Sequence, residues 1–152
     1  MAEWSCVQSM TGMEHCEDHY NHYDANYPPV DGEVYYGRGP LQISHNYNYG
    51  AFGSEYLEDP DRVLHSSENA FKSALWFWTT AQDGKPSMHS VASQSSFRFG
   101  ELTNIINGGI ECGVYGNSTK AMNREGYYQT LRTKFGYGAE TVQGCADLTP
   151  YH

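Results

Sequence analysis

The chain has 152 residues, of which 18% are charged and 14% are aromatic, a composition typical of a single folded domain rather than a disordered chain. Its 9 basic and 18 acidic residues give a formal net charge of −9, which argues against nucleic acids and anionic membranes as partners, because both are bound by clustered Lys and Arg. No stretch is long and apolar enough to predict a transmembrane helix.

The first half of the chain is expected to be largely irregular. Residues 1–36 show neither a helical nor an alternating apolar period. Residues 37–40 (Gly-Arg-Gly-Pro) form a turn cluster, in which Pro40 is suited to begin a short helical stretch. Ser44 is a candidate N-cap for a second helical turn. Residues 58–67 have the composition of a loop.

A helix with one apolar face is predicted after residue 67. Ser67 is its candidate N-cap, and Gly84 and Pro86 are expected to stop it. Trp76 and Phe77 widen the apolar face, so we expect this helix to be buried in the core nearly all round. The apolar face is formed at three-four spacing by Ala70, Phe71, Ala74, Leu75 and Trp78.

Two further helices are predicted after a Ser-rich link. The first is expected to end at Gly108 and Gly109, and the second is expected to begin near Ser118 and to end at Gly136. No internal repeat or strand-rich region is found, so the predicted class is mainly α with long loops. The residues expected to point inward are Phe99, Leu102, Ile105 and Ile106 in the first helix and Ala121, Tyr128, Leu131 and Phe135 in the second.

The four cysteines allow three disulfide connectivities, and the residues alone do not choose among them. The simplest interpretation has two local pairs, Cys6–Cys16 and Cys112–Cys145; the alternative is four reduced thiols in a cytosolic protein. Residues 117–119 (Asn-Ser-Thr) form a glycosylation acceptor, which favours secretion to an oxidising, extracellular compartment. Residues 1–6 lack the basic and apolar regions of a signal peptide, so we expect the leader to lie outside this sequence.

Residues 15–22 (HCEDHYNH) are dense in potential zinc ligands. His15 and His19 would share a face if the segment were helical. However, no second cluster with paired ligand spacing follows, and Cys16 is expected to form a disulfide with Cys6. We therefore expect no metal site.

Three blocks of the sequence resemble the plant-type chitinases of glycoside hydrolase family 19. Residues 35–50 (YYGRGPLQISHNYNYG) match the family's signature nearly residue for residue, and residues 70–78 (AFKSALWFW) and 104–113 (NIINGGIECG) follow in the expected order and spacing. Cys145 falls where the partner of the family's C-terminal disulfide lies. The resemblance covers residues 27–145.

The resemblance implies a lysozyme-like, two-lobed helical domain with chitin bound in a cleft between the lobes. It also implies inverting hydrolysis of β-1,4-linked N-acetylglucosamine, which needs a general acid and a general base about 6.5–9.5 Å apart. The family's acid lies in a His-Glu-Thr type motif, and no His-Glu pair occurs here. We therefore expect residues 1–152 to be the C-terminal part of the catalytic domain, with the acid upstream.

The family's general base precedes the Gly-Arg-Gly-Pro block, in a variable loop. Three glutamates of this sequence are candidates for it: Glu3, Glu14 and Glu17. Glu3 ranks first because it lies close to Cys6, as the family's glutamate lies close to a cysteine. For each of them the competing interpretation is a solvated surface charge.

Several residues of the first block match sugar-binding or catalytic positions of the family. Ser44 matches the serine that helps the base to hold the attacking water, although it could instead cap a helix. Gln42, Tyr47 and Asn48 match residues that hydrogen-bond the sugar, and an amide suits an N-acetyl group because it carries donors and an acceptor. Tyr27 falls where many relatives carry Trp, and its ring could stack on a pyranose.

Four later residues match further positions. Gln82 and Lys85 match subsite residues, although Lys85 could instead interact with a helix dipole. Asn107 matches an asparagine that contacts the sugar from the opposite wall, with a turn residue as the alternative. Arg124 matches an arginine that pairs with the catalytic carboxylates, and a surface pair with Glu125 is the alternative.

The expected function is therefore endo-acting hydrolysis of chitin by a secreted monomer. No cofactor is expected, because two carboxyl groups suffice for the reaction. Two alternatives remain open at this point. One is a chitin-binding module that has lost catalysis, and the other is a muramidase-like enzyme acting on peptidoglycan, since lysozyme-like folds host both chemistries.

Overall fold

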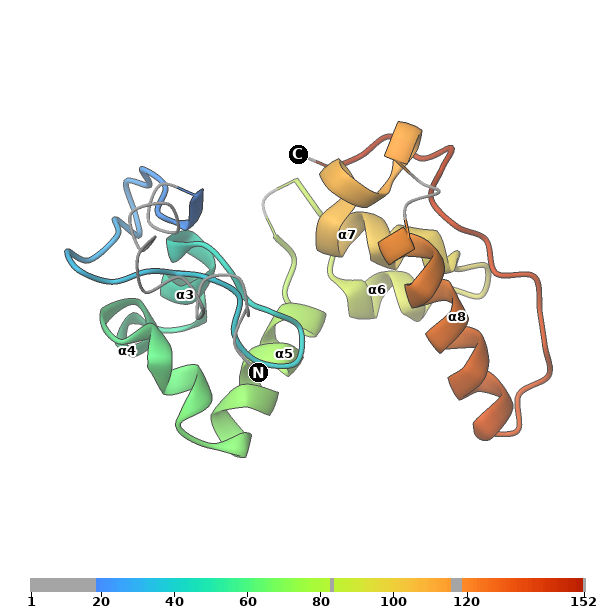
Figure 1. Cartoon of the computed structure of the whole chain (residues 1–152), viewed down its shortest axis with the longest axis horizontal. Helices are drawn as coiled ribbons and strands as arrows, with labels where there is room; N and C mark the ends of the chain where they lie inside the picture. Colours follow the sequence, from blue (N-terminus) through green and yellow to red (C-terminus); the bar gives the residue numbers. More distant parts are fainter. Residues whose placement is uncertain (1–18, 83, 116–118, 152) are drawn as a thin grey trace. The chain divides into compact units, whose positions relative to one another are not determined.

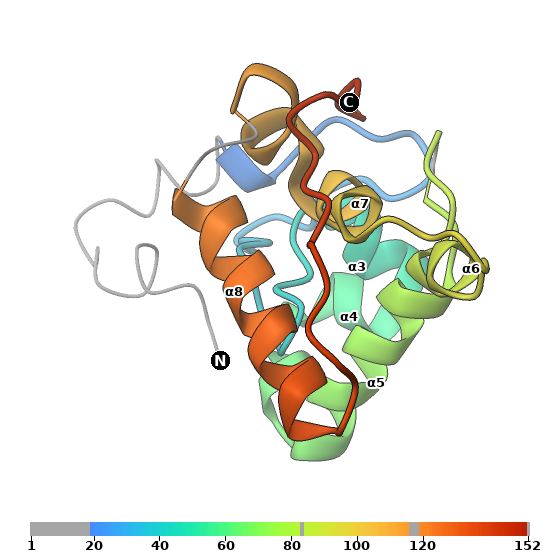
Figure 2. The ribbon, with the colours of Figure 1, turned by 90° about the vertical axis from the view of Figure 1, so that its right-hand side faces the viewer.

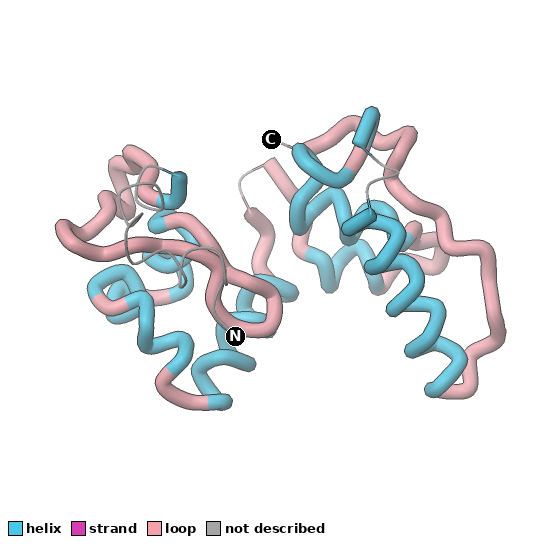
Figure 3. Tube along the Cα trace, viewed as in Figure 1, coloured by secondary structure: helices cyan, strands magenta, loops and turns pink. Residues whose placement is uncertain are grey.

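The computed structural model describes residues 19–82, 84–115 and 119–151, which form helices joined by long loops (Figures 1 and 3). Within these ranges there is no β-strand, only the isolated bridges Arg38–Ile43 and Gln82–Lys85. The predicted mainly α class with long loops is therefore confirmed. In the part of the chain that is described, no helix has the length and apolar character needed to cross a membrane. The chain divides into two compact units, Met1–Phe77 and Trp78–His152.

The first unit contains short helices around a core rich in tyrosine. Its helical elements are α3 (Asn46–Phe52), α4 (Ser54–Glu58), the 3-10 helix η1 (Pro60–Leu64) and most of α5 (Ser67–Thr79). Phenol groups in such a core need hydrogen-bond partners. The Tyr35 hydroxyl, for example, donates to the Leu57 carbonyl at 2.7 Å and accepts from the Val30 amide at 3.0 Å. The core residues are Tyr20, Tyr35, Ile43, Tyr49, Tyr56 and Val63.

A buried arginine ties this core together. The Arg38 guanidinium pairs with Asp61 at 2.8 Å and donates to the Val34 carbonyl at 2.9 Å and the Tyr49 hydroxyl at 3.1 Å. The guanidinium carbon lies 3.6 Å from the centre of the Tyr36 ring. These contacts offset the loss of hydration that burial of a cation entails, and they fix the loop that leads into α3.

The start of α3 differs from the prediction. Pro40 begins no helix, because the backbone of Arg38 and Ile43 is paired in both directions, at 3.1 and 2.9 Å, and this bridge closes residues 39–42 into a turn. Ser44 caps no helix either; its hydroxyl donates to the Gln42 carbonyl at 2.9 Å. The predicted loop at residues 58–67 contains η1, whose first residue is a proline, as helix starts favour.

Helix α5 begins and ends earlier than expected. The hydroxyl of Ser66, not that of Ser67, accepts the N-terminal hydrogen bond, from the Asn69 amide at 3.1 Å. The helix ends at Thr79, before the predicted stop at Gly84.

The prediction that α5 is buried nearly all round is wrong. Phe71 and Leu75 are each 62% exposed. Trp76 packs at the edge of the core, with its ring centre 5.5 Å from that of Phe52. Phe77 and Trp78 are half-buried, so all three aromatic residues predicted as core are buried only in part. The period of apolar residues identifies a helix face without specifying what covers it.

The second unit contains α6 (Met88–Ala92), α7 (Phe99–Glu111), the 3-10 helix η2 (Gly113–Tyr115) and α8 (Thr119–Lys134). Part of the Ser-rich link is therefore helical, and Ser87 caps α6 by accepting from the Ser90 amide at 3.1 Å. After α8 an extended segment runs back beside that helix and then past α7 (Figure 2). The buried apolar residues are Met88, Val91, Leu102, Ile105, Cys112, Ala121 and Cys145.

Helix α7 runs through Gly108 and Gly109, where it was expected to end. Gly108 serves close packing instead of termination, since a Cβ there would collide with the amide of Asn104 and lie 3.2 Å from the Tyr151 nitrogen. The backbone departs from helical geometry only at Asn107, with φ −155° and ψ 39°. Leu102 and Ile105 are buried as predicted, whereas Phe99 and Ile106 are half-buried.

The disulfide Cys112–Cys145 is present, as predicted. The predicted end of α8 is also confirmed: Gly136 has φ +80°, a conformation that glycine adopts without strain. The inward face predicted for α8 is only partly correct, because Leu131 and Phe135 are exposed. The predicted pair Cys6–Cys16 and the predicted helix start at Ser118 lie outside the described residues.

Candidate functional site

In the first unit the candidate residues gather on the turn that precedes α3 and on its first helical turn. Gln42 and His45 have positive φ values, 54° and 69°, so the chain reverses sharply there. Local hydrogen bonds hold the polar side chains: Gln42 Nε2 donates to the Gly39 carbonyl at 2.8 Å, and Asn48 Nδ2 donates to the Ser44 carbonyl at 2.8 Å. Fixed amides next to one hydroxyl form a surface able to pair with a polar ligand.

Tyr47 extends this surface. Its ring lies parallel to that of His45, with the centres 5.3 Å apart and an interplanar angle of 5°. The His22 ring lies next to both, with its centre 4.8 Å from that of His45 and 6.3 Å from that of Tyr47. Burial, assisted by the negative charge of Asp24, raises the pKa of the Tyr47 phenol, so its hydroxyl stays protonated, and able to donate, to a more alkaline pH than an exposed tyrosine would.

Tyr27 is held against α3. A Cβ on Gly50 would collide with the Tyr27 ring, so this glycine is needed for the contact. The Tyr27 carbonyl accepts from the buried amide of Asn46 at 2.6 Å, and the same amide group bonds the backbone of His22 in both directions. The predicted sugar-stacking residue thus uses part of its ring to pack on the helix.

The second unit contains a buried carboxylate. Glu111, at the end of α7, is 1% exposed. Its Oε1 accepts from Arg124 Nη2 at 2.8 Å and from Asn107 Nδ2 at 3.0 Å. Glu111 Oε2 and Arg124 Nε are also buried and have no hydrogen-bond partner among the described residues. A carboxylate in this position needs the adjacent cation, because an unpaired buried charge is very costly.

The geometry of α7 explains this cluster. Asn107 and Glu111 lie within α7 and are joined by a side-chain hydrogen bond, although the backbone at Asn107 is not helical, and Arg124 of α8 reaches the same carboxylate oxygen. The structure thus joins two predicted residues, Asn107 and Arg124, through a third that the sequence analysis missed. Arg124 pairs with Glu111, and not with its neighbour Glu125. The available signal was the glutamate directly before Cys112 in the third matching block.

Gln82 and Lys85 lie together in the turn after α5. The Lys85 amide donates to the Gln82 carbonyl at 2.9 Å, and Gln82 Nε2 donates to the Thr80 carbonyl at 3.4 Å. Burial lowers the pKa of the Lys85 ammonium group. Since α5 already ends at Thr79, Lys85 is not part of its last turn.

The candidate general bases Glu3, Glu14 and Glu17 lie outside the described residues, so the structure gives no position for any of them. Within residues 19–82, 84–115 and 119–151, no three His, Cys, Asp or Glu side chains are grouped so that they could hold a metal ion.

A family model described as "Chitinase class I" matches residues 3–142. The chain therefore belongs to glycoside hydrolase family 19, as the three sequence blocks predicted.

Relatives and solved structures agree with this assignment. The chain is 41% identical to Chitinase 3 of Oryza sativa subsp. japonica over 141 residues, which are 82% of this chain and 44% of that protein. It is 46% identical to Endochitinase 3 of Solanum tuberosum over 121 residues, 69% of this chain and 38% of that protein. The chain thus spans less than half the length of these two curated relatives.

The crystal structure of a class IV family 19 chitinase from Zea mays matches with a TM-score of 0.63 and 33% identity, covering 86% of this chain and 68% of that one. Chitinase C from Streptomyces griseus HUT6037 matches with a TM-score of 0.66 and 28% identity, covering 85% and 54%. The predicted lysozyme-like fold is confirmed by these similarities.

Proposed function

We propose that this chain supplies substrate-binding residues of an endo-acting, inverting chitinase, which hydrolyses β-1,4-linked N-acetylglucosamine. The observation that carries the proposal is the turn at residues 42–48, in a chain of this family. There Gln42 and Asn48 are fixed by backbone carbonyls, with the Ser44 hydroxyl between them in sequence. Each amide offers both a donor and an acceptor, which the N–H and C=O of an acetamido group require.

The proposed roles follow the chemistry of the side chains. In the first unit Gln42, Tyr47 and Asn48 hydrogen-bond the sugar, Tyr27 contacts a ring face, and Ser44 helps to hold the attacking water.

In the second unit Gln82, Lys85 and Asn107 provide further sugar contacts. Arg124 supplies a positive charge that favours an ionised catalytic carboxylate, and Glu111 fixes the direction in which the guanidinium points. Glu3 is the proposed general base.

The physiological partner proposed here is chitin or a chito-oligosaccharide, bound by a monomer without nucleic acid or membrane contacts. An extracellular location is proposed because Cys112 and Cys145 form a disulfide, a bond that persists in oxidising compartments. No cofactor enters the proposed reaction.

Binding of penta-N-acetylchitopentaose to the full chain, measured by calorimetry, tests the proposal. Gln42→Ala and Asn48→Ala should each weaken binding by about tenfold, the effect of about 1.4 kcal/mol, which is typical for loss of a polar contact. Gln94→Ala is the matched control, because Gln94 is an exposed amide outside the candidate site and should leave the affinity unchanged. Equal affinities for all three variants and the unmodified chain would contradict the proposal.

A second candidate, chitin binding without hydrolysis, is favoured by one observation: the sequence contains no His-Glu pair. A proton NMR time course with chitohexaose separates the candidates. Hydrolysis that first yields the α-anomer supports the inverting enzyme, and first appearance of the β-anomer argues against it. Binding without turnover decides for the second candidate, whereas cleavage of peptidoglycan without chitin binding would favour a muramidase.

A further inference from the structure

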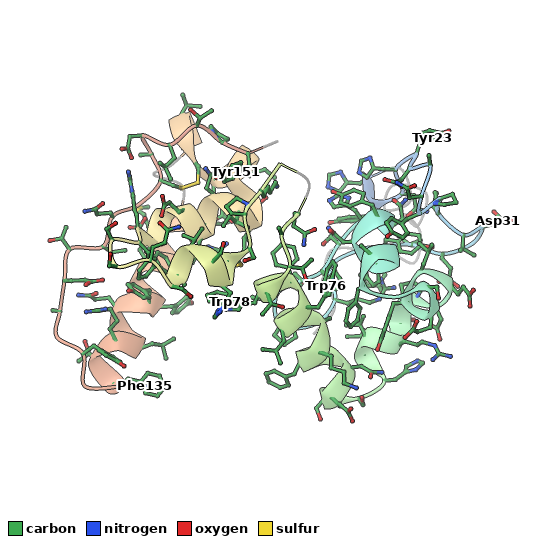
Figure 4. All side chains as sticks on the ribbon, turned by 180° about the vertical axis from the view of Figure 1, so that it is seen from behind. Tyr23, Asp31, Trp76, Trp78, Phe135 and Tyr151 are labelled. Atoms are coloured by element: carbon green, nitrogen blue, oxygen red, sulfur yellow. A yellow bond between two sulfur atoms is a disulfide. The ribbon has the colours of Figure 1, made fainter. Side chains whose placement is uncertain are left out.

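A pocket lies beside the C-terminal end of α8. It encloses about 280 Å³ and is lined by Tyr128, Leu131, Arg132, Phe135 and Tyr137. Figure 4 shows Phe135 where the helix ends. None of these residues was predicted to take part in function.

The turn after α8 builds the pocket. Gly136, with φ +80°, reverses the chain so that the Tyr137 amide donates to the Arg132 carbonyl at 3.0 Å. The Arg132 guanidinium then lies 5.7 Å from the ring centres of both Tyr128 and Tyr137. Phe99 stacks on Tyr128 at 4.3 Å and supports this wall from α7. The pocket walls are therefore held by contacts within one unit.

The pocket exposes much apolar surface. Phe135 is 76% exposed, Tyr137 65% and Leu131 52%. Leu131 and Phe135 are four residues apart and share a helix face with Tyr128. The three exposed side chains line one pocket, and apolar side chains grouped in this way are a candidate interaction site.

The charged residues at the pocket determine which kind of ligand it can bind. Arg132 pairs with Glu140 at 3.1 Å and donates to the Gly138 carbonyl at 3.2 Å, so its charge is already neutralised. An anionic ligand would have to displace Glu140. Arg132 Nε is buried and has no hydrogen-bond partner among the described residues, so it could donate to a ligand carbonyl only after the side chain moves to expose it. The pocket therefore suits a neutral ring with apolar faces and a carbonyl acceptor.

We propose that this pocket is a second, non-catalytic carbohydrate site that takes one N-acetylglucosamine ring of a chitin chain. The C–H faces of the pyranose would lie against aromatic rings, and the acetamido carbonyl would face Arg132. The pocket is slightly smaller than typical sites for drug-sized ligands, as expected for a single ring. The choice of ligand rests on the proposed function.

This site is separate from the cluster around Glu111. Arg124, which pairs with Glu111, and Arg132 lie on the same helix, eight residues apart, which corresponds to a rise of about 12 Å. A second point of attachment would retain the protein on an insoluble polymer through multivalency, without any change in the affinity of the first site.

The test compares retention on insoluble chitin by depletion from solution. The double variant Phe135→Ser/Tyr137→Ser of the full chain should bind about tenfold more weakly, as loss of aromatic contacts at the centre of a site commonly causes. Tyr127→Ser is the matched control, because Tyr127 is an exposed tyrosine of the same helix that does not line the pocket. Cellulose, which lacks acetamido groups, should retain the unmodified chain poorly.

Three results would overturn the proposal. The first is equal retention of the double variant and the Tyr127→Ser control on chitin, and the second is equal retention of the unmodified chain on cellulose and on chitin. The third is a dimer of the unmodified chain in sedimentation velocity that the double substitution dissociates while retention on chitin is unchanged. A map of amide chemical shifts in the unmodified chain, titrated with di-N-acetylchitobiose, needs no variant; shifts at Arg132 and Tyr137 are expected, and their absence at saturation would contradict the site. The weaker binding of penta-N-acetylchitopentaose expected for Gln42→Ala tests the proposed function separately.

Discussion

The carboxylate of Glu111 lies in the interior of the second unit, where two neighbouring side chains compensate the cost of its burial. Arg124 supplies the opposite charge and Asn107 a second donor, both to the same oxygen. Because Arg124 is itself only 33% exposed, this pair is screened by water less than a surface pair is. A change at any of the three residues is therefore expected to affect the other two.

Substitution of Arg124 by Met keeps the length of the side chain but leaves Glu111 without a cation. We expect the free energy of unfolding to fall by about 2–4 kcal/mol, because an uncompensated buried charge remains. The double variant Glu111→Gln/Arg124→Met should recover much of this loss. Arg62→Met is the control: Arg62 pairs with Asp59 at the surface, so its loss should cost less than about 1 kcal/mol. Urea unfolding measures all three, and equal losses for Arg124→Met and Arg62→Met would contradict the prediction.

Lys85 should make stability depend on pH. Burial lowers the pKa of its ammonium group, so the unfolded chain holds this proton more tightly than the folded chain. The free energy of unfolding therefore rises with pH from the lowered pKa up to the ordinary value near about 10.4. Lys85→Met should stabilise the protein at pH 7, and this gain should shrink by pH 10. Thermal melts at pH 7 and pH 10 check this prediction, with Lys134→Met as the control, because Lys134 is exposed. A gain in stability that grows with pH would refute it.

At the scale of single residues, the family resemblance predicted roles for Asn107 and Arg124 but none for Glu111. A glutamate is usually exposed, so burial of this one follows from packing that no local pattern encodes. The same holds for Arg38, which the sequence placed in a turn and which the structure buries among Tyr36, Tyr49 and Asp61.

Helix α7 and the extended C-terminal segment touch at a glycine. The Gly100 amide donates to the Gln143 carbonyl at 2.8 Å, and a Cβ on Gly100 would collide with the backbone of Gly144. Gly126, on α8, has open space around it instead. Of these two helical glycines, Gly126 has room for a side chain and Gly100 does not.

Gly100→Ala should lower the free energy of unfolding by about 1–3 kcal/mol, because the C-terminal segment must move to make room. Gly126→Ala should raise it by up to about 1 kcal/mol, since alanine favours a helix and meets no obstacle. Thermal or urea unfolding of the two variants measures the difference. Changes of the same sign in both variants would show that the contact at Gly100 is not tight.

At the scale of elements, apolar periodicity predicted that α5, α7 and α8 exist, but not where α5 and α7 end or which residues are covered. The sequence pattern predicts a helix stop at Gly108, whereas its role is close approach to Asn104 and Tyr151. Phe71 and Leu75 have the spacing of a buried face and are exposed. In both cases the deciding factor is the neighbour in space, which a local pattern of residues does not contain.

On the scale of the whole molecule, the described disulfide belongs to the second unit alone. It joins residues 33 positions apart, and in the chain-entropy model a loop of this size contributes about 3–4 kcal/mol. The first unit has its own core of tyrosines, described above. The two units should therefore respond differently when the disulfide is lost.

Cys112→Ser/Cys145→Ser should speed hydrogen exchange at the amides of residues 102–105 in α7, because local opening there no longer works against the closed loop. The amides of α3 should exchange as before. Mass spectrometry of peptides from the two segments gives both rates in one experiment. An equal increase in both segments would show that the units open together.

The family and the fold were predictable from three sequence blocks, which lie in both units. Each block contains apolar residues of a helix together with residues that make close contacts to it. The position of the general base was not predictable, because the family's loop that holds it varies in sequence, and only the closeness of Glu3 to Cys6 ranks it ahead of Glu14 and Glu17.

The disulfide also determines whether proteolytic cleavage of the chain can be detected on a denaturing gel. Between Cys112 and Cys145 lie all of α8 and the exposed turn at residues 136–140, where a protease meets accessible backbone. A single cut in that turn would leave both pieces covalently joined, so the apparent mass on a denaturing gel would stay nearly unchanged. Only after reduction would two fragments separate, and a preparation judged intact without reductant would contain clipped molecules.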